Sequence, residues 1–222
     1  MPDPGAQPGP DDALDAQLVT RIRNGDQQAW TELLTRYQDR LFGVCLRMIG
    51  TGPQARQTAS DLCQESMVKV IQGLHTFDNQ AKLSTWMIRV TMNVCLSHLR
   101  SQKLRRHASL DSPRSGNPQQ PGGAGSAKAS RSGSTLYFQP LAQEPDSDLR
   151  IQHDEDVSRV ARALSKLDSD QRAILVLRDV RGLDYEHIAQ VLSLQLGTVK
   201  SRIFRARMAL KAILEAEQRK GP

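Results

Sequence analysis

Near the C-terminus, side chains of the kind that bind polyanions recur along one short stretch of the sequence. Lys200, Arg205 and Arg207 supply cations. Ser201 adds a hydroxyl group and Phe204 adds an aromatic ring. Cations pair with phosphates, guanidinium groups bind base edges, and apolar groups pack on the thymine methyl. A phenyl ring gains nothing on a solvated face among cations, so the pattern favours a groove-reading helix over an ordinary charged surface helix.

The apolar residues around this stretch predict the elements that hold it. Asp184 is a suitable N-cap for a short helix, which a tight turn separates from a second helix. The positions expected to face inward recur at helical spacing: Ile188, Ala189, Val191, Leu192, Val199, Ile203, Ala206 and Leu210. The sequence therefore predicts a helix-turn-helix whose second helix reads DNA.

The composition bounds the fold class. The chain has 222 residues, of which 38% are hydrophobic and only 4% are aromatic, and its formal net charge is +6. So few aromatic residues argue against a large sandwich or barrel core, whereas the abundant leucine, alanine, arginine and glutamine suit helices. We expect an all-α protein with two small helical domains and a polyanionic partner.

The sequence also indicates a compartment and a redox state. It contains no apolar stretch long enough to cross a membrane and no signal-peptide pattern at its start, so we expect a cytoplasmic protein without membrane insertion. Cys45, Cys63 and Cys95 lie in apolar helical patterns, which indicates reduced core thiols. Cys95 and His98 have metal-ligand spacing, but without a second pair we favour helix packing and expect neither metal nor cofactor.

Changes in composition divide the chain into four segments. We expect residues 1–12 to be disordered, 13–107 to form a helical domain, 108–150 to form a flexible linker, and 151–216 to form a second helical domain. Within the linker, the segment TLYFQP at 135–140 is either a docking segment or a merely adhesive spot.

Apolar periodicity predicts the individual helices. A short helix ends at Gly25, Asp26 caps a long helix from Gln27 to about Ile49, and a further helix over 54–75 carries Ile71 on its apolar side. In the second domain, Val160 belongs to an inward-facing set. Asp168 begins the next helix, and Gly182 ends it.

Two sets of motifs in this order resemble the extracytoplasmic-function type of bacterial RNA polymerase sigma factor. The N-terminal matches are RIRNGDQQAWTELLTRYQDRLFG, ASDLCQESMVKVIQGLHTF and LSTWMIRVTMNVCLSHLR. The C-terminal match runs from LSKLDSDQRAIL to GTVKSRIFRARMAL. The chain departs from the family pattern in the turn, where Ser193 replaces a usual glycine and Gln195 a usual serine-type N-cap.

The resemblance implies binding partners and the residues that contact each of them. It implies core RNA polymerase as a partner for Asp61, Gln64 and Glu65, and promoter DNA as the second partner. It also allows an anti-sigma protein between the two domains, although no residue indicates one. The residues implied for the melted −10 strand are Asn79, Gln80, Lys82, Ser84, Thr85, Trp86, Arg89 and Asn93, of which Trp86 fits a core position better. The residues implied for the −35 duplex are Thr198, Lys200, Ser201, Phe204, Arg205 and Arg207.

The resemblance therefore implies a transcription initiation factor that is not an enzyme. The sequence contains no phosphate-binding glycine loop, nucleophile elbow, or cluster of histidine and carboxylate residues. Two other classes stay as alternatives: a stand-alone helix-turn-helix regulator that does not join the polymerase, and an enzyme whose basic surface binds a phosphorylated substrate.

Overall fold

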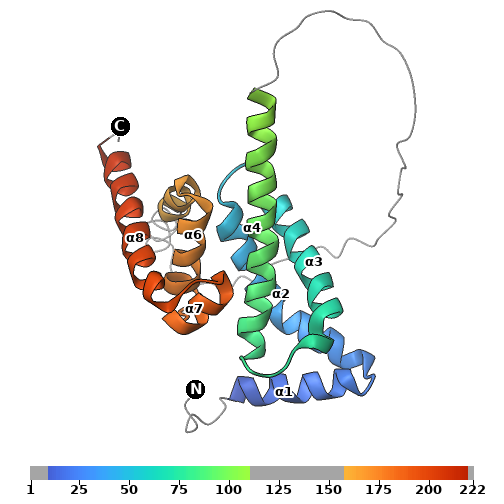
Figure 1. Ribbon diagram of the computed structural model, residues 1–222. Coiled ribbons are helices and arrows are strands. Elements are labelled where there is room, and N and C mark those ends of the chain that lie inside the picture. The colour runs from blue at the N-terminus through green and yellow to red at the C-terminus, as the bar shows by residue number, and fades with distance from the viewer. Residues whose placement is uncertain (1–9, 111–157, 220–222) are drawn as a thin grey trace, which may run out of the picture.

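The structure, a computed structural model, describes residues 10–110 and 158–219, with side chains over 11–105 and 158–219. All regular elements of these residues are helical, which confirms the all-α fold class (Figure 1). The N-terminal unit consists of α1 (Pro10–Arg23), α2 (Gln27–Ile49), α3 (Ala55–Gly73), the short 3-10 helix η1 (Leu74–Thr76) and α4 (Leu83–Leu110). The C-terminal unit consists of a helix over 158–166, α6 (Ser169–Leu175), the π-helical turn η2 (Val176–Val180), α7 (Tyr185–Leu192) and α8 (Leu196–Gln218).

In the N-terminal unit, α2, α3 and α4 pack on one another, and α1 lies across one end of them (Figure 1). Gly25, at φ +89°, ends α1, and the Asp26 carboxylate accepts the N–H groups of Gln28 and Ala29, so the expected stop and cap are confirmed. Helix α1 begins at Pro10, inside the segment expected to be disordered. Its first turn is held by an ion pair of 2.6 Å between Asp11 and Arg36.

In the C-terminal unit, local caps separate short helices. Asp168 accepts the N–H of Asp170, and Gly182, at φ +68°, follows the π-helical turn that continues α6. The expectation for Val160 is wrong: its side chain is 41% exposed. Val160 lies one turn before the buried Leu164, near the first described residue of this helix, where less of the unit covers it.

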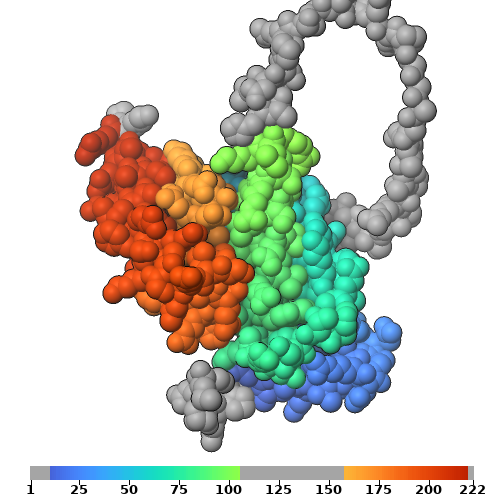
Figure 2. Space-filling model, in the orientation of Figure 1, coloured from blue at the N-terminus to red at the C-terminus, as the bar shows by residue number. Residues whose placement is uncertain are grey.

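The two units lie directly against each other. Their buried side chains form one continuous cluster, and the space-filling view shows the C-terminal unit seated on α4 (Figure 2). Helices α6 and α7 both contact α4, and α6 and η2 contact α2. The expected linker begins inside α4, and its TLYFQP segment lies outside the described residues.

The three cysteines lie in the core of the N-terminal unit. The Sγ atoms of Cys95 and Cys45 are 3.7 Å apart, and all three thiols are free and buried. A thiol contact with Cys45, together with burial, raises the pKa of Cys63, so the protonated thiol is favoured. This arrangement confirms the core position expected for the three cysteines. Separately, no helix of the described residues is long and apolar enough to span a membrane.

Candidate nucleic-acid interface

The turn between α7 and α8 positions the predicted reading helix. The Asp184 side chain accepts the N–H of His187, as expected of an N-cap. Burial opposes ionisation of Asp184, but the hydrogen bonds from His187 outweigh it and keep the pKa of Asp184 below its usual value. Ser193 adopts the left-handed conformation at φ 53°, and Gln195 makes no side-chain cap hydrogen bond. Packing of the two helices therefore maintains a turn whose own residues stabilise it weakly.

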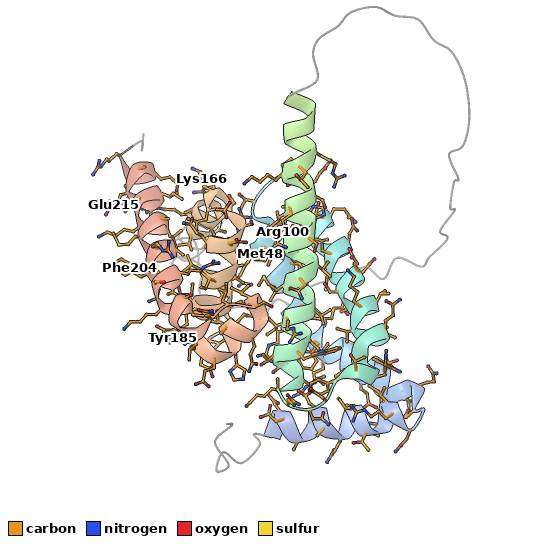
Figure 3. The ribbon with its side chains drawn as sticks, viewed as in Figure 1. Met48, Arg100, Lys166, Tyr185, Phe204 and Glu215 are labelled. Carbon is orange, nitrogen blue, oxygen red and sulfur yellow. The ribbon has the colours of Figure 1, made fainter. Side chains whose placement is uncertain are left out.

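Helix α8 separates a buried side from an exposed one. Val199, Ile203 and Ala206 are buried, as predicted, and Leu210 is partly buried. The opposite side is exposed, and Phe204 keeps 65% of its surface open to solvent (Figure 3). Met208, one turn further on, is 51% exposed and extends this apolar strip, and the helical spacing did not predict this extension. Such an apolar strip among cations is suited to groove contact.

The cations of α8 fall into two groups. Among the described residues, Lys200 and Arg205 form no ion pair, and both are exposed. By contrast, Arg207 forms an ion pair with Asp179 of η2 and donates to both of its carboxylate oxygens. This ion pair raises the pKa of Arg207. The hydroxyl group of Ser201 donates to the carbonyl of Thr198. Thr198 lies at the edge of the exposed face and is only partly exposed.

The residues expected to bind the melted strand surround the beginning of α4. Asn79 and Gln80 are exposed in the connector before α4, and the backbone of Asn79 has φ 60°. Lys82 forms an ion pair of 2.7 Å with Asp12 of α1. Ser84 and Thr85 turn toward the C-terminal unit, and Thr85 is only 8% exposed. One edge of this surface is therefore partly covered.

Further along α4, Arg89 and Asn93 are exposed one helical turn apart, so one molecule can contact both. Trp86 instead packs its ring 5.5 Å from the ring of Phe77, on the side where α3 ends. A Cβ atom placed on Gly73 would lie 3.3 Å from the Trp86 ring. Trp86 is thus a packing residue, in line with the core interpretation.

A third surface lies along α3. Asp61, Gln64 and Glu65 are exposed on neighbouring turns of one side, where Glu65 pairs with Lys69 at 2.9 Å. The prediction that Ile71 lies on the apolar side is wrong, because Ile71 is 44% exposed. It follows Gln64 by seven residues, or about two turns, and therefore shares its face. Val68 is 50% exposed on the same side, which gives the acidic surface an apolar centre.

Comparisons with known proteins match both units. The model of the family "Sigma-70 region 2" matches residues 33–105, and the model of "Sigma-70, region 4" matches residues 158–210. The chain thus has the two-part organisation of a transcription initiation factor of the sigma-70 type.

Similar sequences narrow this class. The RNA polymerase sigma-H factor of Pseudomonas aeruginosa is 31% identical over 204 residues, covering 90% of this chain and 94% of that protein. The ECF RNA polymerase sigma-E factor of Salmonella typhimurium is 31% identical over 197 residues, covering 88% and 92%. The chain belongs to the extracytoplasmic-function (ECF) family of RNA polymerase sigma factors.

Solved structures share the fold. CnrH, in complex with the cytosolic domain of CnrY, has a TM-score of 0.55 at 24% identity, covering 93% of this chain and 97% of that one. The sigma factor RpoE of Bartonella quintana, in complex with the anti-sigma factor NepR, has a TM-score of 0.56 at 22% identity, covering 83% and 96%.

Proposed function

We propose that this chain binds core RNA polymerase and brings it to promoters that have two separate recognition elements. Helix α8 reads the −35 duplex, and the beginning of α4 with its connector holds the melted −10 strand. The observation that carries the proposal is the occurrence of two exposed polar surfaces, on α4 and α8, in the two family regions of one chain. The polymerase performs the chemistry, so the chain needs no catalytic group or cofactor, and it acts in the cytoplasm.

For the −35 element, the proposal rests on the unpaired cations and apolar strip of α8. Lys200 and Arg205 are free to bind phosphates or base edges, and Phe204 is free to pack against a base methyl. Thr198 and Ser201 add polar contacts at the edge of the same face. Arg207 takes part through its pair with Asp179, which fixes α8 on the rest of the unit.

For the −10 element, the exposed Arg89 tracks the strand and Asn93 contacts an unstacked base. Asn79 and Gln80 supply further hydrogen-bonding groups from the connector, and Lys82, Ser84 and Thr85 supply the partly covered edge. Trp86 supports this surface from beneath by packing on Phe77.

For the polymerase, the proposed contact is the α3 surface of Asp61, Gln64 and Glu65 together with the exposed Val68 and Ile71. A purely solvated helix face has no use for an apolar centre, whereas an interface core does. An anti-sigma protein that binds between the two units is part of the proposal. The similar sigma factor RpoE of Bartonella quintana was solved in complex with an anti-sigma factor, NepR.

The test mixes the purified full-length chain with core polymerase and measures co-elution, then transcript starts from genomic DNA fragments. We expect V68D to weaken co-elution at least tenfold, because it places a charge at the centre of the contact. T35A, an exposed position on α2, is the matched control and should co-elute like the parent. A chain that binds duplex DNA alone, and never the polymerase, would be a stand-alone regulator and would refute the proposal.

A further inference from the structure

The connector of residues 77–82, between η1 and α4, is the part of the surface proposed for the melted strand that lies outside any helix. Asn79 and Gln80 are exposed in it, and the backbone of Asn79 is left-handed at φ 60°. The carboxylate of Asp78 accepts the N–H of Gln80 at 3.1 Å. A left-handed residue other than glycine persists where surrounding contacts hold it, and asparagine adopts this conformation more readily than most residues. One hydrogen bond does not fix the whole connector, so neighbouring elements have to contribute.

The first outside contact fixes the beginning of the connector. Arg23, at the C-terminal end of α1, donates to the carbonyl of Phe77. Phe77 is 5% exposed, its N–H donates to the carbonyl of Leu74 at 3.1 Å, and its ring centroid lies 5.5 Å from that of Trp86. Among the described residues Arg23 forms no ion pair, so its guanidinium is committed to this carbonyl. The backbone at Phe77 is thus held from both sides.

The second outside contact fixes the end of the connector. Lys82 forms its ion pair of 2.7 Å with Asp12, near the N-terminal end of α1. The carbonyl of Lys82 accepts the N–H of Trp86 at 3.0 Å, which begins the hydrogen bonding of α4. Residue 77 lies by residue 23 and Lys82 lies by Asp12, so the connector runs antiparallel to α1 (Figure 1). Along the axis of α1, the two contacts are separated by about 16 Å.

Helix α1 is itself fixed on α2, so it can hold the connector. Leu18 is 2% exposed on the inner side of α1. Asp15 is 4% exposed and accepts a hydrogen bond from the hydroxyl group of Tyr37, in α2. Closer to the C-terminal end of α1, Arg21 forms an ion pair of 2.8 Å with Glu32 of α2. These contacts extend along most of α1, and Arg23 and Asp12 therefore project from a firm support.

A connector that is held in advance has a consequence for strand binding. Ordering a mobile loop during binding costs conformational entropy, whereas a loop that is already in its bound form avoids that cost. Hydrogen-bonding groups also distinguish one base from another only when their supports keep them in one place. The base preference of Asn79 and Gln80 should therefore depend on the residues of α1 that hold the connector.

We propose that α1 is the positioning element of the −10 site. Arg23 and Asp12 hold the two ends of the connector, so that Asn79 and Gln80 are already arranged for an unstacked base before DNA arrives. The claim about the base rests on the proposed function. The arrangement of the connector does not, because Arg23 and Asp12 contact the connector within this chain alone.

Hydrogen exchange in the free full-length chain tests the arrangement. R23M keeps a long side chain but removes the donor to the carbonyl of Phe77, and D12N removes the charge that pairs with Lys82. We expect each variant to speed amide exchange of the peptide over 77–82 about fivefold or more. Peptides from α2 should exchange as in the parent, which shows that the unit is folded. The matched control is Q17M, at an exposed position of α1 that makes no side-chain hydrogen bond or ion pair among the described residues.

Base preference in the holoenzyme tests what the arrangement does. The probes are melted promoter fragments made from a mapped transcript start, each with one −10 base of the non-template strand changed. R23M and D12N should both lower the preference for the favoured base at one position, by about fivefold or more. The two substitutions change the net charge in opposite directions, so an effect of charge alone would shift the affinity for all probes in opposite directions. R23K keeps a donor for the carbonyl of Phe77 and should restore most of the preference.

The other outcomes separate the two claims. Unchanged exchange in folded R23M and D12N would overturn the positioning role. Faster exchange with the parent's base preference would overturn it as well, because the connector would then read without support. If R23M instead lost affinity evenly on all probes and its salt slope fell by about 1, Arg23 would bind phosphate directly. If the parent holoenzyme showed no base preference while the variants exchanged faster, the proposed function would be refuted and the arrangement of the connector would stand.

Discussion

The two proposed reading surfaces are built differently. On α8, Lys200, Phe204 and Arg205 project from a helix whose buried side alone holds the fold, so their side chains have no structural task. At the beginning of α4, three of the eight proposed residues are also structural: Trp86 packs on Phe77, Thr85 is 8% exposed beside the C-terminal unit, and Lys82 pairs with Asp12. The first surface can therefore be changed without changing the fold, whereas changes at these three positions of the second also alter packing or an ion pair.

The largest effect should come from Trp86→Ala. Removing a large aromatic side chain from a packed site typically costs 3 to 5 kcal/mol, and for this partly buried ring we expect about 3 kcal/mol. Urea denaturation followed by circular dichroism measures the loss. Phe204→Ala is the matched aromatic control on α8 and should change stability by less than about 0.5 kcal/mol. Equal destabilisation by the two variants would remove the difference between the surfaces.

The next effect concerns binding by α8. If Arg205 pairs with a guanine, Arg205→Ala should cost about 1 to 3 kcal/mol of binding and relax specificity at one −35 position. Lys200→Ala should weaken binding evenly across sequences, because a phosphate contact carries no sequence information. Holoenzyme binding to a panel of single-base promoter variants separates the two. Identical losses on every member of the panel would show that neither residue reads a base.

Removal of the Asp184 N-cap should have a smaller effect on stability, and this effect should depend on pH. Asp184→Ala should cost about 1 kcal/mol of stability at pH 7, because the N–H of His187 loses its acceptor. The pKa of Asp184 is lower in the folded chain than in the unfolded chain, so its contribution is present above the usual pKa of aspartate and is lost as the pH falls through the folded value. Parent and variant should therefore converge in thermal unfolding below about pH 4. A constant difference down to pH 2 would contradict this account.

Features with a local cause could be predicted from the sequence. The preferences of single residues predict the end of α1 at Gly25, the bounds of α2 after the Asp26 cap, and the Asp184 cap of α7. Ile71 was misplaced because an amphipathic pattern does not distinguish a core from an exposed apolar patch. Arg172 donates to the carbonyl of Met48, and Arg207 forms an ion pair with Asp179. Both contacts join residues far apart in the chain, and such contacts leave no periodic signal in the sequence. The contact between the two units therefore had no sequence signature.

The smallest effect separates reading from positioning within α8. The exposed pair of Arg207 and Asp179 should contribute less than about 1 kcal/mol to stability. Because Arg207 is proposed to act through its pair with Asp179, we expect Asp179→Ala to reduce −35 binding as much as Arg207→Ala, although Asp179 is an acidic residue. If Arg207 binds phosphate directly, Asp179→Ala releases its guanidinium and should strengthen binding, because the cation is no longer neutralised. Holoenzyme affinity measured at two salt concentrations decides, since Arg207→Ala would then remove one phosphate-binding cation and lower the salt slope by about 1.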